Sequence, residues 1–221
     1  MSSTDLFQAI KSGDLAGVER VLRADPALAA AREQGGVSAV LTALYHGQPA
    51  ICARLLAERP ELDVFEAAAT GTMDRLRELL DGDPSLANAF APDGFHPLGL
   101  AAFFRHGEAV RLLLERGADP APASRNGLAV TPLHSAVATN AGPRDLGIVR
   151  ALLDAGAPVS ARSAQDGTPL HTAAFTGDVE VARLLLECGA DPSLTNDSGR
   201  TPLDIARDRG HDRIVELLER R

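Results

Sequence analysis

Residues 168–192 read TPLHTAAFTGDVEVARLLLECGADP, and this stretch decides the fold. Thr168 and Pro169 suit the start of a helix, because a threonine side chain caps free N–H groups and proline fits the first turn. Gly177 indicates a turn, and the apolar residues after it recur at helical spacing. Gly189 then favours a left-handed helix end. The stretch therefore predicts a helix, a turn and a second helix.

The start of this stretch recurs along the chain. Thr-Pro-Leu-His or a related tetrapeptide stands at 96–99, 131–134, 168–171 and 201–204. A second repeat covers the N-terminal part, where the pattern of residues 5–26 returns at 63–84, an offset of 58. Repeated helical units form an extended surface rather than one catalytic pocket, so the repeats favour a binding function.

These motifs resemble those of the ankyrin-repeat family, in a stand-alone bacterial form. The resemblance is strongest over residues 167–218, through Thr-Pro-Leu-His, the leucine-rich second helix, Gly-Ala-Asp-Pro at 189–192 and Gly210-His211. It implies an all-α fold, an ankyrin-repeat α-solenoid of about seven helix-turn-helix units with β-hairpin-like fingers. The units are expected to begin near Thr4, Ser38, Leu62, His96, Thr131, Thr168 and Thr201.

The spacing of these units predicts a single ankyrin-repeat domain over residues 1–221. We expect an N-terminal cap unit at 1–33, internal units at 34–198 and a C-terminal cap unit at 199–221, because the open ends of a stack must meet water. The short step before Leu62 leaves too little chain for a finger there. Extra residues at 139–146 predict a protruding loop.

Composition and charge exclude several function classes. The 221 residues carry a net charge of -8, whereas binding to a phosphate backbone needs a basic stripe. No run approaches the roughly 20 apolar residues that span a bilayer, and the first residues lack an export signal. We therefore expect a cytoplasmic monomer that binds neither nucleic acid nor a membrane.

The sequence also lacks the usual motifs for metals, phosphates and nucleophilic catalysis, so we expect no metal and no cofactor. Cys52 and Cys188 fall in distant repeats and are expected to be reduced. One lysine stands against 21 arginines, and alanine, glycine and proline are abundant, which suggests a GC-rich bacterial genome.

His134 and His171 belong to the repeated tetrapeptide. The resemblance implies a structural role, in which each imidazole bonds the backbone of the next repeat. Another residue holds this position in the N-terminal units: Phe7, Leu41, Phe65 and Gly99. We expect apolar packing to replace the bond there. Arg105 stands where the family has a turn glycine, which predicts a displaced turn.

The resemblance also places variable, ligand-contacting positions after the small alanine pair of each first helix and on the fingers. The candidate contact residues are Tyr45, His46, Thr70, Phe90, Phe103, Phe104, Thr139, Phe175 and Thr176. Large residues alternate with small ones such as Ala69 and Ala138. We expect these positions to form an aromatic-lined slot on the concave face.

Two functions compete for this slot. In the first, aromatic anchors bind a protein partner. In the second, the slot holds an elongated, apolar, polyketide-like small molecule. An enzyme of the lyase or cyclase type would then use Tyr45, His46 and Glu66 as an acid–base set, with Arg105 or His106 stabilising negative charge.

A third interpretation is that Phe103 and Phe104 only compensate for poor packing nearby, since exposed apolar residues are common on protein surfaces. We favour a non-catalytic binding module with a protein partner, because no complete catalytic set is visible in the sequence.

Overall fold

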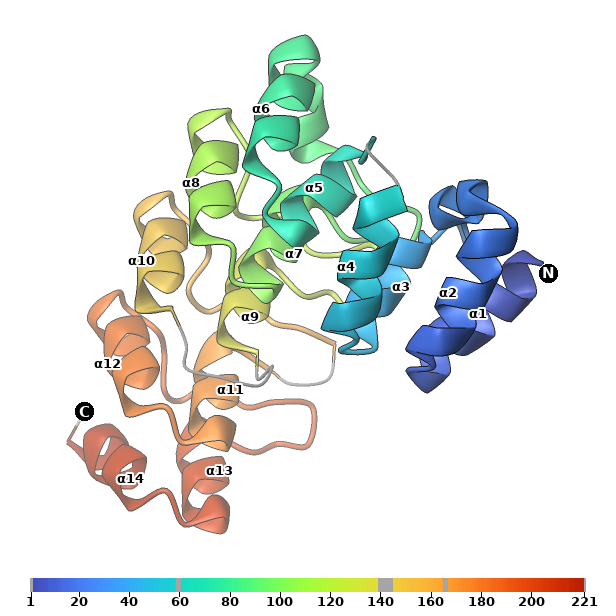
Figure 1. Cartoon of the computed structure of the whole chain (residues 1–221). Coiled ribbons are helices and arrows are strands. Elements are labelled where there is room, and N and C mark those ends of the chain that lie inside the picture. Colours follow the sequence, from blue (N-terminus) through green and yellow to red (C-terminus); the bar gives the residue numbers. More distant parts are fainter. Residues whose placement is uncertain (1, 59–60, 139–144, 165–166, 221) are drawn as a thin grey trace.

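The computed structural model describes residues 2–58, 61–138, 145–164 and 167–220. Within these ranges the chain is all-helical and forms an α-solenoid of paired helices (Figure 1). The first helices of the pairs are α1 (Ser3–Ser12), α3 (Ala39–Tyr45), α5 (Val64–Thr70), α7 (Pro97–Phe103), α9 (Pro132–Val137), α11 (Pro169–Thr176) and α13 (Pro202–Arg209). The second helices are α2 (Leu15–Ala24), α4 (Pro49–Glu58), α6 (Met73–Gly82), α8 (Gly107–Glu115), α10 (Leu146–Asp154), α12 (Val179–Glu187) and α14 (Asp212–Glu219).

Each first helix packs against the second helix of its own pair, and neighbouring first helices pack against each other along the stack. Figure 1 shows the second helices α6 to α14 along one side of the arc, with α7 to α13 beside them. Helix caps fix where the first helices start. Thr131 and Thr201 both accept a backbone N–H of the first turn through their side chains, as the sequence predicts.

The apolar core follows the stack as two large clusters. One runs through the first four helices, from Leu6 to Leu55, and the other runs from Leu62 to Leu218. Leu56 packs against both clusters. A third, small cluster of Leu41, Ala69 and Leu100 lies where α3, α5 and α7 meet.

The 58-residue offset seen in the sequence extends to the helix boundaries. A shift of 58 carries α2 onto α6 and α3 onto α7 without any change in their limits. It also carries the short 3-10 helix η1 (Pro26–Ala30) onto η2 (Pro84–Asn88). The first four helices and the next four are therefore two copies of one structure.

Histidines connect successive repeats, as the resemblance implies. His134 Nδ1 accepts the Thr131 N–H, and Nε2 lies 3.2 Å from the Gly167 carbonyl oxygen in the next finger. His171 bonds Thr168 and the Arg200 carbonyl in the same way, the latter at 3.0 Å. Because Nδ1 accepts, Nε2 carries the proton and donates it to the carbonyl.

The expectation that apolar packing replaces this bond throughout the N-terminal half is wrong at one unit. There His96 occupies the N-cap position, and its Nδ1 accepts the Gly99 N–H. Its Nε2 lies 3.2 Å from the Pro122 carbonyl oxygen in the next finger. The imidazole has moved three residues along the chain, about one helical turn, and still reaches the neighbouring repeat. Phe7 and Leu41, by contrast, are buried in apolar clusters as expected.

The predicted displacement of the turn at Arg105 is also wrong. Arg105 has a left-handed backbone with φ of 65°, and Gly47, its equivalent 58 residues earlier, has φ of 64°. In both copies the next residue donates its N–H to a helix carbonyl at 2.9 Å, His106 to Ala101 and Gln48 to Ala43. These bonds keep the turn in place, so the arginine adopts the glycine conformation.

The fingers are turns closed by backbone hydrogen bonds. Before α7, Gly94 N–H bonds the Ala91 carbonyl, and neighbouring fingers bond each other through Arg125 N–H to Gly94 at 2.8 Å. Antiparallel pairing in the described part of the chain is limited to isolated bridges at Arg32 with Ser38 and Ser163 with Gly167. The predicted loop at 139–146 lies mostly outside the described residues. None of the described helices combines the length and the apolar character needed to cross a bilayer.

Candidate binding groove

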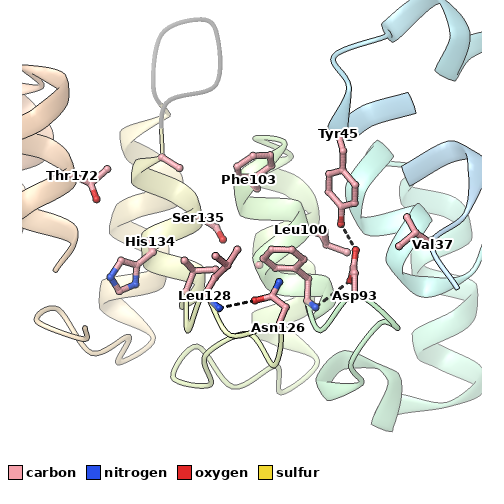
Figure 2. Close-up of a pocket in the computed structure, with 14 residues that line it drawn as sticks. Val37, Tyr45, Asp93, Leu100, Phe103, Asn126, Leu128, His134, Ser135 and Thr172 are labelled. Atoms are coloured by element: carbon pink, nitrogen blue, oxygen red, sulfur yellow. Dashed lines mark hydrogen bonds between the residues drawn. The ribbon is translucent and has the colours of Figure 1, made fainter. Parts of the chain in front are cut away.

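A pocket of about 480 Å³ lies between the fingers and the first helices in the middle of the stack (Figure 2). We call it the concave pocket. Its finger residues are Val37, Asp93, Phe95, Asn126, Leu128 and Val130. Its helix residues are Tyr45, Gly99, Leu100, Phe103, His134, Ser135, Ala138 and Thr172. Four first helices, α3, α7, α9 and α11, therefore contribute with the fingers to one cavity with a mainly apolar lining.

Turn chemistry positions the finger side of the concave pocket. Asn126 Oδ1 accepts the Leu128 N–H at 3.2 Å and the Ser124 hydroxyl at 2.8 Å, so its side chain holds the turn closed. Leu128 is left 40% exposed. Figure 2 shows Leu128 and Asn126 facing the helix residues across the cavity.

An aromatic cluster forms the side of the pocket nearer the N-terminus. The ring centroid of Tyr45 lies 6.4 Å from that of Phe95 and 5.9 Å from that of Phe104. Phe103 meets Phe104 edge to face at 5.0 Å. Such tilted and edge contacts are favourable arrangements for aromatic rings. The cluster joins α3 of the first copy to α7 of the second.

Tyr45 donates its hydroxyl to Asp93 Oδ2 at 2.6 Å, across the two copies. Burial raises the pKa of Tyr45, and the hydrogen bond to Asp93 and its negative charge raise that pKa further. The phenol therefore stays protonated at neutral pH and serves as a hydrogen-bond donor. Asp93 Oδ1 also accepts the Phe95 N–H at 3.2 Å, which fixes the carboxylate on the finger.

Gly99 leaves room at the floor of the pocket. The three atoms nearest to a Cβ at this position would belong to the His96 ring, at 3.4 Å or more. The equivalent position holds an imidazole in the next two repeats, at His134 and His171. Because His96 makes the inter-repeat bond from the N-cap, position 99 needs no side chain.

The sequence-predicted contact residues divide into two groups. Tyr45 and Phe103 line the concave pocket, and Phe104 packs behind them against the cluster of Leu41, Ala69 and Leu100. Among the described residues, the other predicted contacts do not line it. Phe90 lies under the Arg125 guanidinium at 3.7 Å, and Phe175, 47% exposed, lies under that of Arg209 at 3.6 Å.

The remaining predicted contacts are polar. Thr70 and Thr176 bond carbonyls of their own helices, at Glu66 and Ala173. His46 is the exposed C-cap residue of α3. Thr139 lies outside the described residues.

The structure does not bring the candidate acid–base residues together in one site. Glu66 is fully buried and caps α5, where its Oε2 accepts the Asp63 N–H at 2.9 Å. His106 covers Gly71, and burial lowers its pKa although a bond to the Ala69 carbonyl opposes the shift. Among the described residues, Tyr45 is the one member of the predicted catalytic set that lines the concave pocket.

Sequence reasoning missed several pocket residues. Asp93 and Asn126 each precede a glycine, so the sequence indicates only a turn at these positions, and it does not single out Leu128 or Ser135. The signal that could have found the pocket is the tetrapeptide His-Pro-Leu-Gly at 96–99, where histidine and glycine depart together from the Thr-Pro-Leu-His pattern. This paired change leaves position 99 without a side chain, while the imidazole at position 96 keeps a hydrogen bond to the next finger.

Comparison with known proteins agrees with this architecture. The chain is 44% identical over 59 residues to the human protein described as "DNA-binding protein RFXANK", a match that spans 27% of this chain and 23% of that protein. The family model described as "Ankyrin repeats (3 copies)" matches residues 64–163 and 133–220, which is well over half of the chain. Repeats of this kind are protein-interaction modules. With its paired helices, interlocking histidines and this match, the chain belongs to the ankyrin-repeat family.

Proposed function

We propose that this protein is a binding module that holds an extended segment of a protein partner in the concave pocket. The observation that carries the proposal is the cavity of about 480 Å³ between fingers and first helices, with Tyr45, Phe95 and Phe103 on its walls. Aromatic side chains in a concave, largely desolvated site supply most of the affinity in many protein interfaces. The fingers and helices that carry them are held by backbone bonds, so little ordering is needed on binding.

A second candidate is an elongated apolar small molecule, because the cavity volume falls in the range typical of small-molecule sites, roughly 300 to 1,000 Å³. The acid–base chemistry that such an enzyme needs has weaker support. Tyr45 has a raised pKa and keeps its proton, and Glu66 and His106 are occupied in capping and turn contacts. The geometry therefore favours binding over elimination or cyclisation.

Our proposal does not include direct binding to nucleic acid. The name of the human relative speaks of DNA binding by that protein, and the match covers 23% of its length. This chain has a net charge of -8, which opposes contact with a phosphate backbone. We propose a protein that works in the cytoplasm as a monomer.

The test fills the pocket without removing any contact. Gly99→Leu places in the pocket the residue that the first copy carries at the equivalent position, Leu41, and a helix tolerates leucine better than glycine. Gly82→Leu is the matched control, because Gly82 is an exposed glycine at the end of α6 and a Cβ there meets nothing within 4 Å.

Heptapeptides selected from a random display library on the wild-type protein provide the probe. We expect Gly99→Leu to raise their Kd by at least about tenfold, as loss of an apolar contact region does, while Gly82→Leu leaves it unchanged. The proposal fails if no peptide is selected, or if folded Gly99→Leu binds the peptides as tightly as the wild type.

A further inference from the structure

The most informative unused group in the molecule is the carboxylate of Asp93. It lines the concave pocket, and its known partners are the Tyr45 hydroxyl and the Phe95 N–H. A carboxylate offers about four lone-pair positions, so capacity for further donors remains. No arginine or lysine forms an ion pair with Asp93 anywhere in the part of the chain that the structure describes.

The surroundings of Asp93 make a cation the preferred ligand. A half-buried carboxylate beside apolar walls focuses a negative potential into the cavity. The rings of Tyr45 and Phe95 stand next to it, and aromatic faces attract guanidinium groups. The chain already uses this contact at two places outside the pocket, where Arg125 covers Phe90 and Arg209 covers Phe175.

A second polar group points to a polypeptide ligand. Ser135 is only 7% exposed and lines the pocket, and its hydroxyl has no hydrogen-bond partner among residues 2–58, 61–138, 145–164 and 167–220. Every fully buried polar side-chain atom of the described residues has a hydrogen-bond partner, so the Ser135 hydroxyl is open to the cavity and available to a ligand. Figure 2 shows Ser135 between Phe103 and Leu128 on the helix side of the cavity. A backbone N–H or carbonyl of a bound segment would satisfy this hydroxyl.

We propose that the concave pocket recognises an extended segment of a partner protein through one arginine and one apolar side chain two residues away. This inference rests on the proposed function. The arginine bonds Asp93 and stacks on the neighbouring rings, because its planar guanidinium suits both a carboxylate and an aromatic face. Residues i and i+2 of an extended chain point to the same side, so the apolar side chain enters the space over Gly99, beside Phe103 and Leu128. The net charge of -8 favours the approach of a basic segment.

The same heptapeptide library tests the arginine directly. We expect peptides selected on the wild-type protein to carry arginine, with leucine, isoleucine, methionine or phenylalanine two positions away. Selection on Asp93→Asn, which keeps an acceptor for the Tyr45 hydroxyl, should lose the preference for arginine. Asp154→Asn is the control, because it makes the same charge change on the exposed end of α10, away from the pocket.

A thermodynamic cycle separates the contact from any effect on folding. Replacing the peptide arginine by uncharged citrulline should raise the Kd for wild-type protein by about tenfold or more, as loss of a charge-assisted bond does, and should change it little for Asp93→Asn. Urea unfolding of each variant checks that it is folded.

Three outcomes would overturn the inference while leaving the proposed function intact. The selected peptides could lack arginine, Asp93→Asn could keep the preference, or citrulline could weaken both proteins equally. Butylguanidine is the last probe. If it binds with the affinity of the peptide, the pocket takes a small cation rather than a segment of a protein, and the inference is wrong.

Discussion

Arg105 and Gly47 show how a single residue tolerates an unfavourable backbone. Both adopt φ near 65° at the same turn of the two copies. A left-handed conformation costs a residue with a Cβ atom about 1 to 2 kcal/mol relative to glycine. The surrounding helix bonds impose this conformation on Arg105.

We predict that Arg105→Gly raises the free energy of unfolding by about 1 kcal/mol, because glycine adopts the turn without strain. Gly47→Ala should lower it by a similar amount, since a Cβ at Gly47 meets nothing within 4 Å and only the backbone conformation is affected. Urea denaturation measures both changes. A decrease in stability for Arg105→Gly would mean that side-chain contacts of Arg105 outweigh its backbone cost.

The buried histidines make stability depend on pH. Burial lowers the pKa of His96, His106 and His171 below the usual 6.5. The unfolded chain therefore binds more protons than the native one near pH 6. The contribution of these histidines to the free energy of unfolding is fully present above pH 6.5 and decreases as the pH falls below it. We predict a smaller free energy of unfolding at pH 5.5 than at pH 7.5. Replacing His96 and His171 together by glutamine should flatten this dependence, and an unchanged slope would contradict the assignment.

The roles of His134 and His171 could be predicted, because both stand in a Thr-Pro-Leu-His tetrapeptide, for which the resemblance to ankyrin repeats implies that role. The role of His96 could not. A histidine at the N-cap position departs from the pattern, and only the structure shows that its ring reaches a carbonyl of the next finger, at Pro122. The role of Asp93 in the pocket could not be predicted either, because its partner Tyr45 lies 48 residues away in the other copy.

Neighbouring residues at the end of a helix can face different surroundings, as Phe103 at the end of α7 and Phe104 directly after it show. Phe103 lines the concave pocket, whereas Phe104 packs against the buried cluster of Leu41, Ala69 and Leu100. The sequence places both rings on the groove, because it cannot tell which side of a helix end faces the finger. We therefore expect Phe103, but not Phe104, to be dispensable for folding.

We predict that Phe103→Ala weakens binding of the selected peptides with a small effect on the melting temperature, while Phe104→Ala lowers that temperature clearly. Leu184→Ala in α12 should cost about 2 to 5 kcal/mol, because the side chain is buried in the main cluster and leaves a cavity. Thermal unfolding and peptide titration distinguish these effects. If Phe103→Ala destabilises the fold as much as Leu184→Ala does, the ring is a packing residue and not a contact for ligands.

At the scale of the whole molecule, the separation of the core into two clusters is the feature that governs unfolding. The helices up to α4 bury one cluster and the helices from α5 onward bury the other, with Leu56 and the small cluster at Leu41 between them. In a linear stack, stability is the sum of unit and interface contributions. A weak interface therefore allows one end to open without the other.

We predict that amide protons of α1 to α4 exchange with solvent by an opening of lower free energy than those of α8 to α12. Leu56→Ala should accelerate exchange in the first four helices and leave the later ones nearly unchanged. Hydrogen exchange followed by mass spectrometry gives the two rates. Uniform protection along the chain, in wild type and variant alike, would show that the stack unfolds as a single unit.

The helical pairs and their order could be predicted from the sequence, because each unit carries its own capping and turn residues. That residues 1–221 form one domain with capping units at 1–33 and 199–221 stays a prediction. The shape of the concave pocket could not be predicted, since it depends on how α3, α7, α9, α11 and the fingers are positioned against one another. Spacing within each repeat does not contain that information.

The exchange between His96 and Gly99 has a consequence for how such a stack can diversify. The imidazole that bonds the next repeat can stand at either of two positions, the N-cap or the residue three places later. The position without the imidazole then leaves free volume on the concave surface. At the contact between the α7 and α9 repeats, the residue that holds the repeats together is thus different from the residue that shapes the binding surface. Evolution or protein engineering can therefore change the shape of the groove one repeat at a time, while each repeat keeps its hydrogen bond to the next.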